Sequence, residues 1–452
     1  MLYKLGDHVF DPEKCVFYYS NLTEEQLKRL DSAIPDRFSS DVNDEQCAVC
    51  ELPKAPPKKA TPYEGGIILT YKCQLRCNYC SYESTDSSEK SLSVSDVKTF
   101  VRYLLKNRLL RNLMSDNGNS VEELSLTFSG GGEPTYDAEF FKEAVLAAEE
   151  VCKENNVKLS LNLTTNGMNG GLVEFIAEHF DSVMISFDGI EAIQNKNRPI
   201  SGGRGSFQTV SENIKRYCSL SDKIKIIIRT TLWQSDYRHL YEIADHIAES
   251  YPQIVNWSVS PMHAGGRGGK NSSSSDFMIS DETDFSRIYF DMKKYLREKK
   301  VSFRFTSPMF WANEVGAYCG QLYLPAAWLF PGGEISTCLD SYKFSPIIGT
   351  IKDGRIQKND DCRNLLAEKY LQKYDECRSC LVYPFCNGGC PLRFLYDSDS
   401  AEAGHLSECN SRISYWKYIF SRIILGETVE GLYLEDDEEL SEFGVKRIRK
   451  RG

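Results

Sequence analysis

Between residues 66 and 260 the chain alternates repeatedly between a short apolar run and a longer segment with helical periodicity. The apolar runs span residues 66–71, 124–129, 159–165, 182–188, 224–231 and 254–260. The helical segments span residues 94–106, 138–155, 172–179, 208–217 and 237–249, and a further one spans 281–299. Such strand–helix units predict an α/β fold with a parallel sheet and right-handed crossovers, either doubly wound or curled into a barrel.

Polar residues gather directly after four of the predicted strands. Residues 73–80 follow the first strand, residues 130–133 follow the second, residues 166–167 follow the third, and residues 188–189 end the fourth. Ligands of parallel sheets bind beyond the carboxyl ends of the strands. We therefore expect the active site at this rim.

Three cysteines in the first of these loops, Cys73, Cys77 and Cys80, are spaced C-x3-C-x2-C. A closed zinc or iron–sulfur site normally has four ligands, so three clustered thiols indicate either a further ligand elsewhere or a metal with an open position. Thiolates are soft donors that suit both iron–sulfur clusters and zinc. A zinc site with three cysteines usually recruits a nearby histidine or cysteine, and the first histidine downstream is His179.

Composition narrows the class of protein. With 452 residues, 41% hydrophobic and 26% charged, the chain is long enough for two or more domains. Its net charge of -10 argues against a nucleic-acid partner. The absence of an 18-residue apolar run and of an N-terminal leader predicts a cytoplasmic protein without membrane contact. In a reducing compartment, the 16 cysteines favour metal ligation over disulfides.

The pattern of residues divides the chain into a small N-terminal α+β region, the strand–helix units, a cysteine-rich region and a charged tail. These regions are 1–60, 61–305, 306–425 and 426–452. A Pro- and Lys-rich linker at 54–62 marks the first boundary. The Gly- and Ser-rich stretch at 263–277 is either a surface insertion or a mobile loop that covers substrate.

The three-cysteine motif, with the aromatic Tyr79 before its last cysteine, resembles the radical S-adenosylmethionine (SAM) superfamily. Four further stretches are similar to that family: "SGGGEPT" at 129–135, "TTNG" at 164–167, "SFDG" at 186–189 and "NKNR" at 195–198. The resemblance implies a partial (β/α)6 barrel, similar to a TIM barrel, and a [4Fe–4S] cluster on the three cysteines. It also implies reductive cleavage of SAM to a 5′-deoxyadenosyl radical, which abstracts a hydrogen from the substrate.

The same resemblance implies a binding site for SAM. The candidate residues are Tyr79, Gly131, Gly132, Glu133, Asn166, Ser186 and Arg198. The Gly-Gly-Glu motif would receive the amino group of the methionine part, because glycine permits close backbone approach and an acid satisfies an ammonium. Ser186 would meet the ribose or the carboxylate, and Arg198 would pair with the carboxylate.

Seven cysteines of the C-terminal region resemble the SPASM domain, which holds auxiliary [4Fe–4S] clusters in radical SAM enzymes that modify peptides and proteins. The resemblance implies two auxiliary clusters, and hence three clusters in the whole chain. One set of ligands is Cys377, Cys380, Cys386 and Cys409, and the other is Cys319, Cys338 and Cys390. A zinc ribbon over 377–390 is the alternative.

The second auxiliary set has a ligand too few. Sulfatase-maturing relatives carry a cysteine a few residues after the first, whereas residues 320–333 contain none here. Either a non-cysteine group completes that cluster, or a substrate thiolate binds there, as in thioether-forming peptide maturases. Asp340 lies one position later than the acid that serves as base in the sulfatase-maturing relatives, and it is the candidate catalytic residue.

The N-terminal region suggests a partner. Peptide-modifying relatives often begin with a leader-binding domain, and residues 1–60 are interpreted as a truncated version of it. An edge strand within residues 2–10 would accept a leader peptide as an added strand. Cys47 and Cys50 form a surface thiol pair, half of a metal site or a ligand pair for an auxiliary cluster, and we assign them no function.

The leading functional hypothesis is a radical SAM/SPASM maturase that forms a thioether or carbon–carbon crosslink in a ribosomally made precursor peptide. The alternative is a sulfatase-maturing enzyme that converts cysteine or serine to formylglycine. A third hypothesis is an iron–sulfur electron carrier, against which the motif at 130–133 argues, since a carrier needs no site for SAM. We expect a precursor peptide and a one-electron reductant such as ferredoxin or flavodoxin as partners.

Overall fold

The computed structural model describes three short N-terminal strands and residues 63–114, 123–262, 266–273, 285–307, 327–339 and 347–359. The N-terminal strands β1 (Tyr3–Leu5), β2 (His8–Asp11) and β3 (Val16–Tyr19) form an antiparallel sheet in the order β1-β2-β3. The predicted strand within residues 2–10 is therefore present, as the hairpin β1–β2. Cys47 and Cys50 lie outside the described residues.

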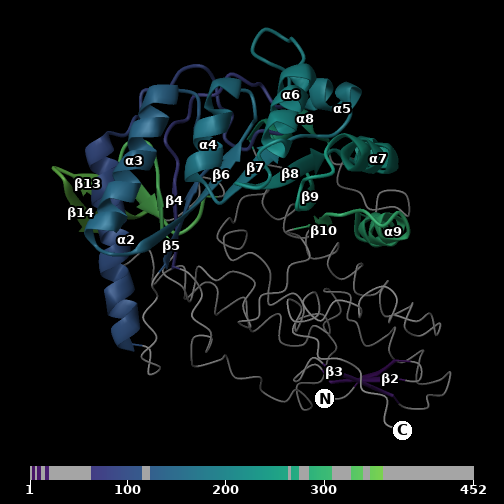
Figure 1. The fold of residues 1–452 in the computed structure, drawn as a ribbon, viewed down its shortest axis with the longest axis horizontal. Helices are drawn as coiled ribbons and strands as arrows, with labels where there is room; N and C mark the ends of the chain where they lie inside the picture. The colour runs from purple at the N-terminus through teal and green to yellow at the C-terminus, as the bar shows by residue number, and fades with distance from the viewer. Residues whose placement is uncertain are drawn as a thin grey trace.

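The main sheet contains the predicted strands as consecutive parallel neighbours (Figure 1). These are β4 (Tyr63–Ile67), β5 (Glu123–Phe128), β6 (Lys158–Thr165), β7 (Ser182–Ser186), β8 (Lys225–Leu232) and β9 (Asn256–Pro261). A short further strand, β10 (Arg304–Thr306), pairs in parallel with β9. The prediction of an α/β fold with a parallel sheet is thus confirmed.

Helices cover one face of this sheet (Figure 1). They are α2 (Val94–Met114), α3 (Ala138–Glu154), α4 (Val173–His179), α6 (Phe207–Cys218), α7 (Leu240–Ser250) and α9 (Phe285–Glu298). Short 3-10 turns, Gly170–Leu172 and Gln234–His239, precede α4 and α7. The helix start at α3 is fixed by Asp137, whose side chain accepts a hydrogen bond of 3.1 Å from the Phe140 amide.

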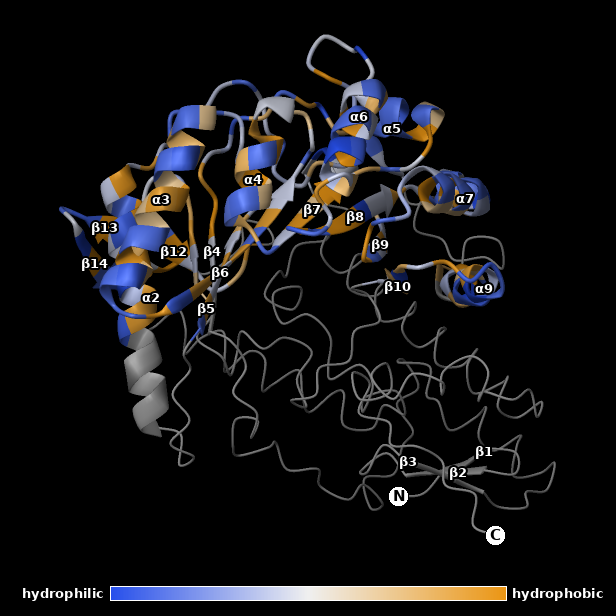
Figure 2. Cartoon of the chain, viewed as in Figure 1, coloured by the Kyte–Doolittle hydropathy of each residue, from blue (hydrophilic) through white to orange (hydrophobic). Residues whose placement is uncertain are grey.

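The core lies between the helices and the sheet. Alternate residues of β5, such as Leu126 and Phe128, are fully buried, whereas the residues between them are only half-buried. Phe128 packs edge-to-face on Phe141 and Phe180, with ring centroids 5.9 Å and 6.0 Å away. Hydrophobic residues accordingly line the sheet-facing sides of the helices (Figure 2). This burial leaves the other face of the strands for polar side chains.

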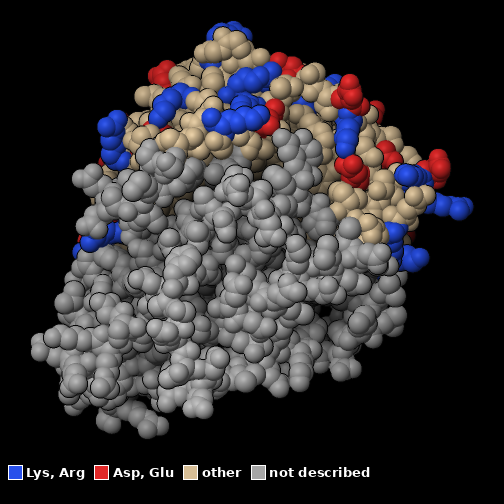
Figure 3. Space-filling model, turned by 180° about the vertical axis from the view of Figure 1, so that it is seen from behind, with Lys and Arg blue, Asp and Glu red and all other residues tan. Residues whose placement is uncertain are grey.

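The outer surface of the helical layer is charged. Lys98 and Glu150 form an ion pair of 2.7 Å between α2 and α3. Viewed from behind, Lys and Arg side chains are interspersed with Asp and Glu over the described surface (Figure 3). Among the described helices, none combines the length and the apolar composition that crossing a bilayer requires.

The sheet continues on the other side of β4. Strand β11 (Ala327–Leu329) pairs in parallel with β4, and the antiparallel strands β12 (Glu334–Ser336), β13 (Ile347–Lys352) and β14 (Arg355–Lys358) follow it. These strands come from the region in which we expected the auxiliary-cluster domain. The first strand of the predicted barrel is therefore an internal strand of an 11-stranded sheet.

Two short helices lie at the rim. Helix α5 (Glu191–Asn197) follows β7, and helix α8 (Gly266–Asn271) follows β9. Helix α8 belongs to the Gly- and Ser-rich stretch for which the sequence left two interpretations, a surface insertion or a mobile covering loop. Its contacts with the cysteine-containing loop are described below.

Candidate active site

The loop that carries Cys73, Cys77 and Cys80 follows β4 at the carboxyl end of the sheet. We call residues 73–85 the cysteine loop. It is closed at its base, where the Cys73 amide donates a hydrogen bond of 2.7 Å to the Thr85 carbonyl. The Arg76 amide donates to the Pro199 carbonyl at 2.7 Å, and the Asn78 amide donates to the carbonyl of Asn197, the last residue of α5, at 2.9 Å. The loop is therefore fixed against the crossover that follows β7.

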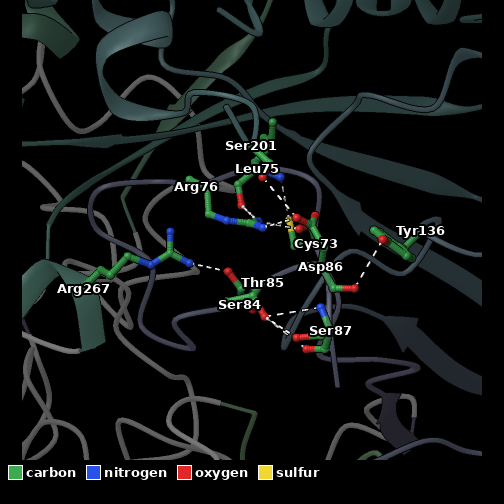
Figure 4. Close-up of polar contacts among 10 residues, drawn as sticks. All are labelled: Cys73, Leu75, Arg76, Ser84, Thr85, Asp86, Ser87, Tyr136, Ser201 and Arg267. Carbon is green, nitrogen blue, oxygen red and sulfur yellow. Dashed lines mark hydrogen bonds and ion pairs between the residues drawn. The ribbon is translucent and has the colours of Figure 1, made fainter. Parts of the chain in front are cut away.

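Arg76 ties the cysteine loop to itself (Figure 4). Its Nη1 donates to the carbonyl oxygens of Cys73 and Leu75, at 2.7 Å and 2.9 Å. Its Nη2 forms an ion pair with Asp86, which also accepts a hydrogen bond of 3.1 Å from the Ser201 hydroxyl. These contacts fix the backbone around the first cysteine.

The surroundings of Cys73 and Cys77 raise the pKa of their thiols and so favour the protonated form. Burial, and then the nearby Glu133 carboxyl, raise the pKa of the Cys73 thiol to about 12. Burial also raises the pKa of the Cys77 thiol, and the neighbouring Cys80 acts in the same direction. A bound cation reverses this preference, because a coordinating thiol is deprotonated outright.

Cys73 Sγ already accepts hydrogen bonds. The Leu75 amide donates to it at 3.4 Å, and the Asn166 side-chain amide donates at 3.6 Å. Donors of this kind stabilise a thiolate ligand and help to set the potential of an iron–sulfur cluster. Asn166, a candidate from the sequence, is thus next to the first cysteine.

The donor set suits an iron–sulfur cluster, because soft thiolates are the ligands that such clusters use. In a [4Fe–4S] cube each thiolate binds a different iron, so its ligands lie farther apart than the ligands of one zinc ion. Three thiols on one loop therefore suit iron–sulfur chemistry.

The glycine-rich loop after β5 packs tightly beside the cysteine loop. Gly130 and Gly131 have φ angles of 57° and 71°, in the left-handed region that glycine adopts readily. A Cβ atom on Gly132 would lie 2.1 Å from the Lys72 carbonyl oxygen, so no side chain fits there. The amides of Gly132 and Glu133 donate to the carbonyls of Thr70 and Lys72, both at 2.8 Å. Glycine at this loop therefore permits contact between two backbones.

Glu133 is 2% exposed and joins the ends of β5 and β6. Its Oε1 accepts hydrogen bonds from the Thr135 amide at 3.1 Å and from the hydroxyls of Thr135 and Thr165 at 2.7 Å. Its Oε2 accepts from the Asn166 amide at 2.7 Å. Burial raises the pKa of this carboxyl, although each of these donors opposes the shift.

A second buried network joins Tyr79 to Asp188 and Arg198. The Tyr79 hydroxyl donates to Asp188 Oδ2 at 2.6 Å and accepts from Arg198 Nη1 at 2.9 Å. Asp188 Oδ1 accepts from the Thr231 amide at 3.1 Å. Burial raises the pKa of the Asp188 carboxyl, while the Arg198 charge acts against it. Arg198 Nε is buried and has no hydrogen-bond partner among the described residues.

The candidate SAM-binding residues are therefore brought to one rim. Ser186, the last residue of β7, is half-buried and lies opposite Arg229 of β8. Arg229 donates to the hydroxyls of Ser258 and Ser260 at 2.8 Å and 2.5 Å, so polar side chains extend along this face of the sheet.

Of the proposed auxiliary-cluster ligands, only Cys338 lies within the described residues. It is buried just after β12. Its neighbour Leu339 accepts a hydrogen bond from the Tyr82 hydroxyl and lies against Gly130. The segment of Cys338 is thus next to the rim. Asp340 and the cysteines Cys319, Cys377, Cys380, Cys386, Cys390 and Cys409 lie outside the described residues.

Several site residues were missed by sequence reasoning. Thr165 was quoted only as part of a motif, and Asp188 only as a strand end, although both hold candidate residues in place. Arg76 and Arg267 carried no signal beyond their charge. Arg267 lies in α8, and its contacts with the cysteine loop are described below.

Comparisons with known proteins agree with this geometry. Residues 67–247 match the family model of the radical SAM superfamily. The cysteine-type anaerobic sulfatase-maturating enzyme of Clostridium perfringens is 25% identical over 373 residues, which cover 78% of this chain and 94% of that protein. The serine-type enzyme of Klebsiella aerogenes is 24% identical over 144 residues, covering 31% of this chain and 33% of that protein.

A solved structure shares the fold. Native anSMEcpe with bound AdoMet and the Cp18Cys peptide has a TM-score of 0.59 at 19% identity, and the match covers 81% of this chain and 99% of that chain. The chain therefore contains a radical SAM domain over residues 67–247 and is a homologue of the anaerobic sulfatase-maturating enzymes.

Proposed function

We propose that the chain is a radical SAM maturase that oxidises a cysteine or serine side chain of a peptide or protein substrate to formylglycine. The observation that carries this proposal is the meeting of the cysteine loop, the loop of Gly131 and Glu133, and the Arg198 network at one rim of the sheet. Similarity to cysteine-type sulfatase-maturating enzymes over 78% of the chain supports the choice of reaction. It reverses the order of our two sequence-based hypotheses.

In this proposal Cys73, Cys77 and Cys80 hold a [4Fe–4S] cluster, and SAM binds beside it. When bound, this pair supplies the 5′-deoxyadenosyl radical that removes a hydrogen atom from the substrate. Asn166 and the Leu75 amide stabilise the Cys73 thiolate through their hydrogen bonds to its sulfur.

The described side chains also suggest how SAM is held. Arg198 pairs with the SAM carboxylate, and its buried, unpartnered Nε supports a ligand at this position. Glu133 Oε1 accepts three hydrogen bonds and Oε2 only one. Oε2 can therefore accept a further hydrogen bond, which in this proposal comes from the SAM ammonium. We place Tyr79 and Ser186 beside the rest of the cofactor.

The oxidation removes a second electron from the substrate, and an auxiliary cluster is the proposed acceptor. Cys338 would ligate one such cluster, next to the rim through the contacts of Leu339 with Gly130 and Tyr82. Asp340 remains the proposed base. We also propose that the protein works in the cytoplasm with a one-electron reductant such as ferredoxin or flavodoxin.

Anaerobic reconstitution tests these assignments. We expect about twelve irons per chain for three cubes, whereas about four would contradict the auxiliary clusters. With dithionite and SAM, the protein should release 5′-deoxyadenosine. Cys77→Ala should abolish this release, and Cys218→Ala, which alters a buried thiol outside the cysteine loop, should retain it. No release from the wild-type protein would leave only the electron-carrier hypothesis.

Mass spectrometry of a cysteine-containing sulfatase peptide tests the reaction. Formylglycine requires loss of the cysteine sulfur, whereas a thioether or carbon–carbon crosslink removes hydrogen atoms and keeps the sulfur. Crosslinking remains the second candidate because residues 320–333 contain no cysteine to complete the ligand set of Cys319, Cys338 and Cys390. A leader peptide added to the β1–β2–β3 sheet would belong to that candidate.

A further inference from the structure

Helix α8 follows β9 and lies directly on the cysteine loop. Its sequence, GRGGKN, has poor intrinsic helix propensity because half of its residues are glycine. The first glycine allows close approach: a Cβ atom on Gly266 would lie 2.4 Å from the Ser81 carbonyl oxygen and 2.5 Å from that of Cys80. Contacts with the cysteine loop therefore explain why this segment is ordered as a helix.

Arg267 makes the central contacts. Its backbone amide donates to the Cys80 carbonyl at 2.9 Å. Its Nη1 donates to the Cys77 carbonyl at 3.1 Å. Its Nη2 donates to the Ser84 carbonyl, a contact drawn in Figure 4. Arg267 thus binds the backbone carbonyls of Cys77 and Cys80, two of the three cysteines, and of Ser84 near the end of the loop.

The rest of α8 supports the same contact. The Asn271 side-chain amide donates to the Asn78 carbonyl at 2.9 Å. Lys270 forms an ion pair with Glu83. Arg267, Lys270 and Asn271 of this short helix therefore hold the cysteine loop from Cys77 to Ser84.

The positive charge of Arg267 lies beside the cysteine loop, where it would affect the reduction potential of a bound cluster. Among the described residues, the Arg267 side chain donates to neutral carbonyl oxygens, whereas the nearby Glu83 carboxylate pairs with Lys270. Two other arginines lie near Cys77, and both contact a carboxylate or its network. Arg76 pairs with Asp86, and Arg198 bonds to Tyr79 in the network of Asp188. A cluster bound by three thiolates gains negative charge on reduction, and a nearby cation favours the reduced state.

We propose that Arg267 is a positioning residue for the cluster: it holds the cysteine loop closed through three carbonyls, and its charge makes the bound cluster easier to reduce. This inference rests on the proposed function, which places a [4Fe–4S] cluster on Cys73, Cys77 and Cys80. Nothing in the sequence motif itself assigns a role to α8.

The test uses the full chain, reconstituted anaerobically, with Arg267→Met, Arg267→Lys and the control Arg216→Met. Arg216 also binds a loop carbonyl and a carboxylate, but at Gly170 and Glu174, outside the cysteine loop. Two quantities are measured: the reduction potential of the cluster whose electron paramagnetic resonance signal changes with SAM, and the rate at which a chelator removes iron.

Arg267→Met is expected to disfavour reduction about tenfold, which is a shift of about 59 mV to more negative potential for one electron. It should also lose iron several-fold faster than wild type. Arg267→Lys keeps the charge but not the planar fork, so its potential should stay near the wild-type value while iron loss remains fast. A merely structural arginine would not separate these two readouts.

Identical potential and iron loss in Arg267→Met and Arg216→Met would overturn the inference. If Arg267→Met does not fold, Asn271→Ala replaces it: this variant removes a loop contact without changing charge, and it should lose iron faster at an unchanged potential. Iron loss at the wild-type rate in that variant would contradict the role of α8. A wild-type chain without any cluster would instead overturn the proposed function itself.

Discussion

Glu133 shows how a single buried carboxylate orders the site. Its four hydrogen bonds come from Thr135, Thr165 and Asn166, which lie at or just after the ends of two neighbouring strands. Hydrogen bonds to a charged group are stronger than those between neutral groups, and a buried charge without them is costly. The same residues that orient a SAM ligand in our proposal therefore also hold the rim together.

Thr165→Val tests this role. Valine has nearly the same shape but removes the hydroxyl that donates to Glu133 and that accepts from the Gly167 amide at 3.1 Å. We expect the free energy of unfolding to fall by about 1.5–3 kcal/mol. Denaturant titration measures it, with Thr127→Val on the half-buried face of β5 as the control, for which about 0.5 kcal/mol or less is expected. Equal losses in the two variants would contradict the prediction.

Gly132→Ala tests the close contact between the two loops. The new Cβ would meet backbone atoms of Tyr71 and Lys72, which cannot rotate away as a side chain would. We expect impaired iron incorporation on reconstitution and a lower melting temperature. Gly171→Ala is the control, because the nearest atom to its Cβ is a side-chain oxygen of Asn169 at 3.4 Å. Normal iron content in Gly132→Ala would show that the loop tolerates the shift.

At the scale of elements, periodicity predicted the long units well and the first strand poorly. The predicted strand covered residues 66–71, but β4 is Tyr63–Ile67. Glycines usually weaken a strand. Here Gly65 and Gly66 are in the strand because neighbours occupy their side-chain positions: Leu104 packs over Gly65, and the ring of Trp328 packs over Gly66. Such contacts between distant segments have no local signature in the sequence.

The sequence did not predict the short elements, for a related reason. Strands such as β11, with three residues, are too short to show a period. Helix α8 has glycines where a helix predictor expects alanine or leucine, and its contacts with the cysteine loop compensate. In the site, motifs placed Cys73, Asn166 and Arg198 at one rim, but the partners that hold them depend on tertiary contacts.

Helix α7 carries a pH-dependent contribution to stability. His246 packs against the rings of Phe207 and Tyr251, at 5.8 Å and 5.7 Å between centroids. Burial, and then the charge of Lys215, lower its pKa, while the acids Glu249 and Glu242 act in the opposite direction. The folded protein therefore binds this proton less readily than the unfolded chain, whose histidine has a pKa of about 6.5.

The stability that neutral His246 permits is therefore present above about pH 6.5 and is lost as the pH falls toward the lowered folded-state pKa. His246→Phe removes the titrating group and keeps an aromatic ring. We expect the melting temperature of the wild-type protein to fall more between about pH 7 and about pH 5.5 than that of the variant. Parallel curves would rule out a contribution from His246.

At the scale of the whole molecule, β4 connects the parallel strands β5–β10 to the C-terminal strands β11–β14. Gly66 accommodates Trp328, so the two segments depend on each other. Gly66→Ala would place its Cβ 2.1 Å from the Trp328 ring and should destabilise the protein. In a Trp328→Leu background the same change should cost less, with a coupling energy of about 1 kcal/mol or more from a double-mutant cycle.

Denaturant titration of the two single variants and the double variant gives this coupling. Leu146→Ala, on the exposed face of α3, is the control, and its effect should add to that of Gly66→Ala. Additivity of Gly66→Ala with Trp328→Leu would mean that the two segments do not depend on this contact.

The internal position of β4 also matters during synthesis. Gly65 pairs with Leu126 soon after both have been made, but its other partner, Ala327, is translated much later. Until then β4 is an edge strand with unpaired backbone N–H and C=O groups, which can pair with a strand of another molecule. We infer that ribosome-bound or chaperone-held protein must protect this edge, and that fragments ending before residue 327 will aggregate.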